Sequence, residues 1–171
     1  MSEYDYRQAN PWWRAIRQIA GTRPVAWLSA RLLHYIDNAV FRVTRGRNTF
    51  TAAVSGLPVI MLTTTGACTG QARTLPIVGL PAGDRIVVIA SNYGQRHNPG
   101  WYYNLLANPR ATVVADGATT EVEARVLRGD EREQWFRRGI EIYPGWIQYR
   151  RRAAHRHIPV IMLVPRASAD I

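Results

Sequence analysis

The residues whose types and spacing suit chemistry lie between Leu62 and Arg73. Thr63-Thr-Thr-Gly66 follows an apolar run, and Gly70-Gln-Ala-Arg73 comes shortly after it. Threonine hydroxyls and the backbone N–H groups of a tight turn bind anions. A guanidinium pairs with phosphate or carboxylate through two parallel hydrogen bonds. The spacing predicts a loop that binds an anionic ligand, with Arg73 as its charged contact; a surface strand arginine is the alternative.

Paired strands are expected on either side of this loop. Val59–Thr65 is a run of apolar and β-branched residues, which favours a buried strand, and Arg73–Leu80 predicts the next one. Pro81–Asp84 predicts a hairpin turn into a third strand over Arg85–Ser91. The anion-binding loop is therefore expected to connect two adjacent strands.

A polar loop and a short helix should follow the third strand. Asn92–Asn98 is the loop, and Pro99 marks the helix start. Trp101 and Leu105 lie one helical turn apart, and Asn108-Pro109 ends the helix. We expect the two apolar side chains to share one face of this helix.

The remaining chain predicts a hairpin, two helices and a last strand. Asp116-Gly117 favours a tight turn between strands over Thr112–Ala115 and Thr119–Leu127. Asp130 with Glu133 resembles a capping box for a helix to Ile142. Tyr143-Pro-Gly145 then interrupts the chain, a short helix carries Trp146 and Tyr149, and Ile158–Val164 forms the final strand. About six short strands joined mainly by hairpins predict an α+β fold, a small closed or split barrel.

The N-terminal third differs in charge from the rest. Residues 7–56 contain eight arginines and one acid, Asp37, which gives a net charge of +7. Asn10-Pro11 and Pro24 mark two helix starts, each followed by apolar residues at helical spacing. A basic, Trp-bearing amphipathic segment suits the surface of a membrane, and packing on the barrel or a partner subunit is the alternative. We expect one domain over 1–171, with 1–56 as a basic helical segment and 57–166 as the barrel core.

Composition limits the class of protein further. The net charge is +10, all 22 basic residues are arginine, and the single cysteine excludes an intrachain disulfide. A spanning helix needs roughly 18 consecutive apolar residues, which the sequence lacks, and the N-terminus does not resemble a secretory signal. These features predict a cytoplasmic protein, peripheral on the inner face of the membrane if residues 10–45 bind there.

Several of these motifs together resemble a known family. Leu62-Thr-Thr-Thr-Gly66, Gly70-Gln71, Arg73-Thr74, Ala90-Ser-Asn92 and the run from Pro99 to Pro109 are similar to the deazaflavin (F420)-dependent nitroreductases. That family belongs to the split β-barrel, FMN-binding-like proteins. The resemblance implies a barrel of about six mostly antiparallel strands, often dimeric, with coenzyme F420 in a groove. It also implies hydride transfer from reduced F420 to a hydrophobic quinone, enone or nitroaromatic substrate.

The resemblance also assigns roles to individual residues. The loop from Gly66 to Arg73 would bind the anionic tail of F420, and Ala90–Asn92 with Trp101 would lie along its ring. Three aromatics near the C-terminus match a family trio that shapes the substrate pocket, and two tyrosines among them are hypothetical proton donors to the substrate. The expected cofactor contacts are Thr65, Gly66, Thr69, Gly70, Gln71, Arg73, Pro76, Ala90, Ser91, Asn92 and Trp101. The expected pocket is Tyr143, Trp146 and Tyr149, with Tyr143 and Tyr149 as the candidate catalytic residues.

The sequence departs from the family pattern inside the loop. Ala67-Cys68 stands where the family usually has two basic residues, and Ala72 replaces a proline. F420 carries several negative charges, so fewer cations favour weaker binding. A binding protein for lipid-like or apolar anionic molecules on the same barrel is therefore the alternative to a reductase.

Three further features predict no separate site. Cys68 has no neighbouring His or acid in the sequence with which to form a nucleophilic pair. His155 and His157 have no evident third metal ligand. Arg150-Arg-Arg152 is basic, yet it is part of no nucleic-acid-binding motif. We expect no metal and no nucleic acid.

Overall fold

The structure is a computed structural model that describes residues 56–166. Within this range six strands form a closed barrel in the order β1-β2-β3-β6-β5-β4, and every adjacent pair is antiparallel. The predicted α+β split barrel is confirmed. The strands are β1 (Val59–Thr65), β2 (Ala72–Ala82), β3 (Arg85–Ile89), β4 (Arg110–Ala115), β5 (Ala118–Val126) and β6 (Val160–Pro165).

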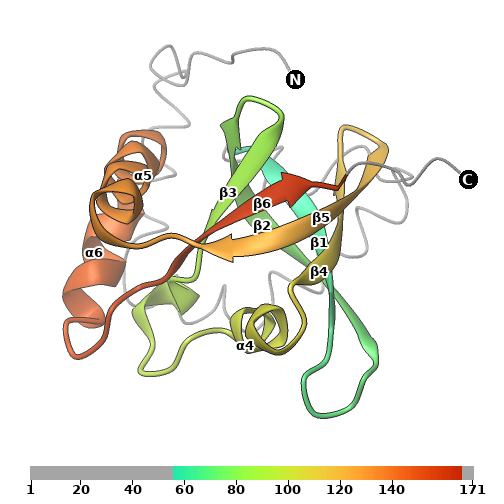
Figure 1. Ribbon diagram of the computed structural model, residues 1–171. Helices are drawn as coiled ribbons and strands as arrows, with labels where there is room; N and C mark the ends of the chain where they lie inside the picture. The colour runs from blue at the N-terminus through green and yellow to red at the C-terminus, as the bar shows by residue number, and fades with distance from the viewer. Residues whose placement is uncertain (1–55, 167–171) are drawn as a thin grey trace, which may run out of the picture.

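The helices of the described range lie against two sides of the barrel (Figure 1). They are the 3-10 helix η2 (Asn92–Gly94), α4 (Gly100–Ala107), α5 (Gly129–Ile142) and α6 (Gly145–Arg152). Helix α4 lies at one end of the barrel, and α5 and α6 lie along its flank. The helices predicted near Asn10 and Pro24 lie outside the described residues.

Alternate side chains of the strands fill the barrel interior. Leu62 of β1, Val88 of β3 and Leu163 of β6 belong to one buried cluster. Trp101 and Leu105 of α4 join that cluster, so α4 closes the barrel end beneath it. The predicted helix with Trp101 and Leu105 on one face is therefore confirmed.

A second buried cluster lies between the barrel wall and helices α5 and α6. Val87 of β3 and Met162 of β6, which face outward, pack with Phe136 of α5 and Trp146 of α6. Fully burying each such apolar side chain contributes about 1.5–3 kcal/mol. The outer face of β3 and β6 is thus covered, which explains why both strands read as unbroken apolar runs.

Two turns show how local residue types set the register. Asp116 and Gly117 have φ of 51° and 79°, the paired positive values of a tight hairpin turn, as predicted. The turn expected over Pro81–Asp84 is shorter, because the ladder continues to Ala82 opposite Arg85. Strand β2 therefore reaches two residues beyond the predicted Leu80.

The predicted capping box at Asp130 and Glu133 is wrong. Helix α5 begins at Gly129 after Arg128, and no side chain caps it. Asp130 instead lies within the first turn, where a carboxylate stabilises the positive end of the helix dipole. Glu133 pairs with Arg132 at 2.7 Å and with Arg150 of α6 at 3.4 Å, so it ties α5 to α6.

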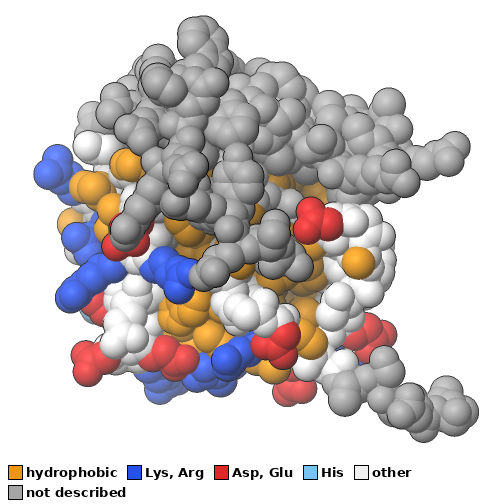
Figure 2. Space-filling view, turned by 90° about the horizontal axis from the view of Figure 1, so that it is seen from above, with side chains coloured by type: hydrophobic (Ala, Val, Ile, Leu, Met, Phe, Trp, Pro, Cys, Tyr) orange, Lys and Arg blue, Asp and Glu red, His pale blue; other side chains and the backbone are white. Residues whose placement is uncertain are grey.

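The opposite end of the barrel from α4 carries mixed charge. Figure 2 views this end and shows arginines and acidic side chains interspersed around apolar ones. Ion pairs such as Arg85–Asp84 and Arg166–Glu121 lie near the strand ends on the surface. Interspersed charge of this kind keeps a surface soluble without forming a strong field of one sign.

Candidate functional site

The end of the barrel nearest α4 collects the chemically promising segments. Strands β1 and β3 both pair antiparallel with β2, so they point the same way and end at the same edge. The β1–β2 loop (Gly66–Gln71) and the β3–α4 loop (Ser91–Asn98) therefore emerge together, with α4 next to them (Figure 1). The two predicted halves of the site share one end of the fold.

The β1–β2 loop is a compact turn that needs glycine. Gly66 N–H donates to Gln71 O at 2.8 Å, and Gly70 N–H donates to Gly66 O at 2.8 Å. Gly70 has φ of 66°, and a Cβ at Gly66 would stand 2.8 Å from Thr69 Oγ1. Side chains larger than hydrogen would strain both positions, which explains the two glycines of the motif.

Asn104 of α4 fastens this loop to the barrel. Its Oδ1 accepts from Ala67 N–H at 3.0 Å, and its Nδ2 donates to Thr64 Oγ1 at 3.0 Å. Thr64 is only 1% exposed, so its hydroxyl depends on this partner. Asn104 lies within the Pro99–Pro109 run of the family pattern, and no role was predicted for it. A polar residue between the buried Trp101 and Leu105 was the available signal.

The donors around the loop suit an anion. Within residues 56–166, the backbone N–H groups of Cys68 and Thr69 have no hydrogen-bond acceptor. Arg73 is exposed, bonds Gln71 Oε1 at 3.3 Å, and forms no ion pair with a described carboxylate. Two free amides and an uncompensated guanidinium are the donor set that phosphate or carboxylate groups require.

Thr65 and Pro76 stand at different distances from this donor set. Thr65 is half-buried at the end of β1 opposite Ala72, next to the loop. Pro76 lies on β2 opposite Met61, and its neighbours Leu75 and Ile77 pack toward the interior cluster. Strand alternation therefore turns Pro76 to the outside of the barrel wall.

The segment after β3 brings Ala90, Ser91 and Asn92 to the same end. Ala90 is fully buried and shares the interior cluster with Trp101. Asn92 and Tyr93 have φ of 46° and 55°, a left-handed conformation that costs non-glycine residues energy. Asn92 Nδ2 donates to His97 O at 2.9 Å, which stabilises the turn from within.

The three predicted pocket aromatics pack against one another. The Tyr143 and Tyr149 hydroxyls lie 2.9 Å apart, and the two residues are only 7% and 4% exposed. Burial is the main cause that raises the pKa of both tyrosines, so both hydroxyls stay protonated through the neutral range. The Tyr143 and Trp146 rings meet edge to face at 5.6 Å. The trio lies in the cluster beneath α5 and α6.

Tyr93 connects this trio to the β3–α4 loop. Its ring meets the Tyr149 ring edge to face, with centroids 5.9 Å apart. A Cβ at Gly94 would stand 2.9 Å from Tyr149 O, so the loop backbone presses directly on α6. The aromatic trio and the predicted ring contacts are thus adjacent through Tyr93 and Gly94.

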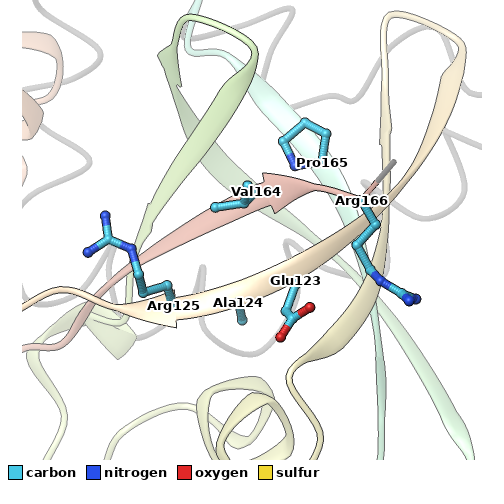
Figure 3. Close-up of a pocket in the computed structure, with 6 residues that line it drawn as sticks. All are labelled: Glu123, Ala124, Arg125, Val164, Pro165 and Arg166. Carbon is cyan, nitrogen blue, oxygen red and sulfur yellow. The ribbon is translucent and has the colours of Figure 1, made fainter. Parts of the chain in front are cut away.

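A separate pocket lies on the outside of β5 and β6, across the barrel from the β1–β2 loop (Figure 3). Its two arginines are already paired. Arg125 donates to both Glu131 oxygens at 2.9 and 2.7 Å, and Arg166 lies 3.6 Å from Glu121. Neither cation is free for an anionic ligand, and none of the predicted site residues lines this pocket. The lining residues are Glu123, Ala124, Arg125, Val164, Pro165 and Arg166.

Other features of the described part hold no site. No three His, Cys, Asp or Glu side chains between residues 56 and 166 are grouped to bind a metal. None of the helices in that range combines the length and hydropathy needed to cross a membrane. Cys68 is exposed and free.

Comparison with known proteins now decides the family. Residues 36–165 match the model of the F420H(2)-dependent quinone reductases. The chain belongs to that family. It is 31% identical over 135 residues to an F420H(2)-dependent quinone reductase of Mycobacterium tuberculosis, which covers 77% of this chain and 89% of the relative. Coenzyme F420 is therefore the cofactor, and F420H2-dependent reduction is the activity class.

Solved structures agree with the fold. A structure described as an F420-H2 dependent reductase is 34% identical, with a TM-score of 0.57, over 62% of this chain and 93% of that one. A second, described as a domain-swapped dimer, is 29% identical, with a TM-score of 0.60, over 82% of this chain and 99% of that one. Both similarities support the barrel fold, and the first is to an F420-H2 dependent reductase.

Proposed function

We propose that this F420H2-dependent reductase uses the β1–β2 loop and Arg73 to bind the anionic tail of F420. The observation that carries the proposal is the donor set of that loop, two unbonded amides beside an unpaired guanidinium. Backbone amides do not depend on side-chain identity. The presence of Ala67 and Cys68 where relatives have basic residues therefore leaves these two donors in place.

The ring of the cofactor belongs, in this proposal, along Ala90–Asn92 and beside Trp101. These residues follow β3 at the same barrel end as the loop, and Ala90 and Trp101 share one buried cluster. When bound, F420H2 supplies a hydride to the acceptor. The tasks left to the protein are to bind the two molecules, orient them and exclude water.

We extend the proposal to a quinone, enone or nitroaromatic acceptor, with Tyr143 or Tyr149 as its proton source. Both hydroxyls are protonated at neutral pH, as a donor requires, and burial raises their pKa and makes each a weaker acid. Both are buried, and the Tyr93 ring packs against Tyr149, so an acceptor reaches the hydroxyls only if this packing opens. Unchanged turnover in the Tyr143→Phe, Tyr149→Phe double variant would eliminate this role.

The setting of the reaction is proposed from the sequence and from one relative. The net charge of +7 over residues 7–56 supports peripheral contact with the inner face of the membrane through residues 10–45. The domain-swapped dimer among similar structures supports a homodimer. Sedimentation with anionic vesicles, with and without residues 1–56, tests the first, and light scattering tests the second.

Titration of the full chain with F420, followed by cofactor fluorescence, tests the central proposal. We expect saturable binding that Arg73→Ala weakens by roughly 10- to 100-fold, because a hydrogen bond to a charged group contributes about 1.5–3 kcal/mol. Arg85→Ala is the matched control, since Arg85 is an exposed strand arginine that pairs with Ala82 at the barrel end away from the β1–β2 loop. No binding at micromolar F420 would favour a lipid-like ligand instead.

A further inference from the structure

The chain just after α6 holds the β3–α4 loop from outside. Three side chains of the segment 152–156 reach backbone carbonyls of that loop. Arg152 Nη1 donates to Tyr93 O at 3.3 Å, and His155 Nε2 lies 3.2 Å from Arg96 O. Arg156 Nε donates to Gln95 O at 3.0 Å. These contacts join residues about sixty positions apart in the sequence, and together they fix one short loop.

Arg156 makes the largest share of these contacts. Besides Gln95 O, its Nη2 donates to Ser91 O at 2.8 Å, and its Nη1 donates to Asn98 Oδ1. These acceptors lie at the beginning, middle and end of the loop. A planar guanidinium presents its donors in a fixed fork, whereas a lysine ammonium cannot bond all three positions at once.

Arg156 is not a surface ion pair. Its three acceptors are neutral, and no described carboxylate lies within ion-pair distance of it. Its guanidinium is half-buried, and that burial lowers its pKa from the ordinary arginine value without removing its charge. Desolvating a charge in this way is unfavourable unless its hydrogen bonds are made, so the three contacts are mutually dependent.

The loop needs such support. Asn92 and Tyr93 are both left-handed, and Gly94 is pressed against Tyr149 of α6. Residues in strained conformations persist only where surrounding structure determines them. Ser91 O, at the start of this strained stretch, accepts from both Gly94 N–H at 2.9 Å and Arg156 Nη2 at 2.8 Å.

We propose that Arg156 is a positioning residue that sets the ring side of the F420 site by fixing Ser91 and Asn92 through the loop carbonyls. The proposal rests on the function proposed above, in which those residues lie along the cofactor ring. Arg156 itself touches no part of the cofactor tail site. It acts through the loop on the ring side of the site, whereas Arg73 binds the anionic tail.

This division predicts opposite effects on binding and turnover. Arg73→Ala should raise the Kd for F420, because it removes a cationic contact of the anionic tail. Arg156→Lys should change that Kd by less than about threefold, yet lower kcat about 10- to 100-fold, since a misplacement of about 1 Å costs that much in hydride transfer.

The experiment compares full-length wild type, Arg156→Lys, Arg156→Gln and the control Arg151→Gln, which changes an exposed arginine of α6. Hydrogen exchange of residues 91–98 without cofactor, urea unfolding, F420 fluorescence titration and turnover with a water-soluble quinone are measured for each. We expect faster exchange confined to the loop in both Arg156 variants, a lowered kcat, and wild-type behaviour in Arg151→Gln.

Three results would overturn the proposal. The first is wild-type exchange in the loop of Arg156→Lys, and the second is loosened exchange with unchanged kcat. Global destabilisation of Arg156→Gln with wild-type kcat in Arg156→Lys would mean a purely structural role, which also overturns it. If the wild type binds no F420, the proposed function fails, and the exchange data still decide whether Arg156 fixes the loop.

Discussion

The two loops at the α4 end of the barrel are built in contrasting ways. The β1–β2 loop is exposed, has two unbonded amides, and is attached to the rest of the fold by Asn104. The β3–α4 loop contains strained residues and is held by Arg152, His155 and Arg156. The first leaves its donors available for a ligand, and the second uses its own acceptors to fix a shape.

This difference matches what the two parts of a large cofactor need. A charged tail is bound through accessible donors, and some freedom in them costs little. A reacting ring must be held in one orientation, so its support has to be rigid before the cofactor arrives. The fold provides the accessible donors and the rigid support at one place, because β1 and β3 point the same way and end at the same edge of the barrel.

The largest effect on stability is expected in the β3–α4 loop. Gly94→Ala should lower the free energy of unfolding by about 3–5 kcal/mol, because it adds a left-handed penalty to a clash with α6. Its Cβ would stand 2.9 Å from Tyr149 O and from Arg152 Cβ. Urea unfolding measures the change.

Gly83→Ala is the matched control for this prediction. Gly83 has φ of 72°, close to that of Gly94, but nothing lies within 4 Å of an added Cβ. Only the backbone penalty of about 1–2 kcal/mol should remain. Equal losses at both positions would show that the contact with α6 contributes nothing.

A smaller effect on stability is expected at Asn104, which attaches the β1–β2 loop to the barrel. Asn104→Ala removes the partners of Ala67 N–H and of the buried Thr64 hydroxyl, and it should cost about 1–3 kcal/mol of stability. Asn104→Asp keeps both contacts, because the Thr64 hydroxyl then donates to the carboxylate.

The aspartate variant separates stability from binding. A negative charge beside the loop should weaken F420 binding roughly tenfold while unfolding stays close to wild type. Fluorescence titration in low and high salt measures this, since the repulsion is screened at high salt. An unchanged Kd at low salt would place the cofactor's charges away from Asn104.

The smallest effect concerns the tyrosine pair beside the rigid loop. Tyr143→Phe removes one hydroxyl of the buried pair and should lower stability by about 1–2 kcal/mol at neutral pH. Since the folded pKa of both tyrosines is raised, the unfolded chain ionises first above about pH 10. Stability is therefore complete below that pH and falls as the pH rises further.

Urea unfolding at pH 8 and pH 10.5 checks the tyrosine prediction. Wild type should lose more stability between these two pH values than the Tyr143→Phe, Tyr149→Phe double variant, which has neither hydroxyl. Identical losses in the two proteins would mean that the tyrosines are not responsible for the alkaline decline.

Much of the barrel was predictable because its signals are local. The apolar run Val59–Thr65, the Asp116-Gly117 turn and the pair Trp101 and Leu105 each depend on a few adjacent residues. The capping box at Asp130 failed because Glu133 is drawn to Arg132 and to Arg150 of another helix. A sequence window cannot show that tertiary competition.

The candidate site was predictable only in part, for the same reason. Glycines and Arg73 stand out by type within one loop. Asn104 and Arg156 act across 37 and up to 65 positions of the sequence, and nothing local distinguishes Arg156 from the three arginines before it. Burial of Tyr143 and Tyr149 likewise depends on how α5 and α6 pack on the barrel, not on the aromatic residues themselves.

Hydrogen exchange with and without F420 tests most directly whether the β1–β2 loop binds the cofactor tail while the β3–α4 loop supports its ring. Saturating F420 should slow exchange strongly at the Cys68 and Thr69 amides, which have no acceptor among the described residues. Residues 91–98, already fixed by Arg156 and its neighbours, should change little. Strong protection of 91–98 with none at Cys68 and Thr69 would contradict the assignment of the tail to the β1–β2 loop.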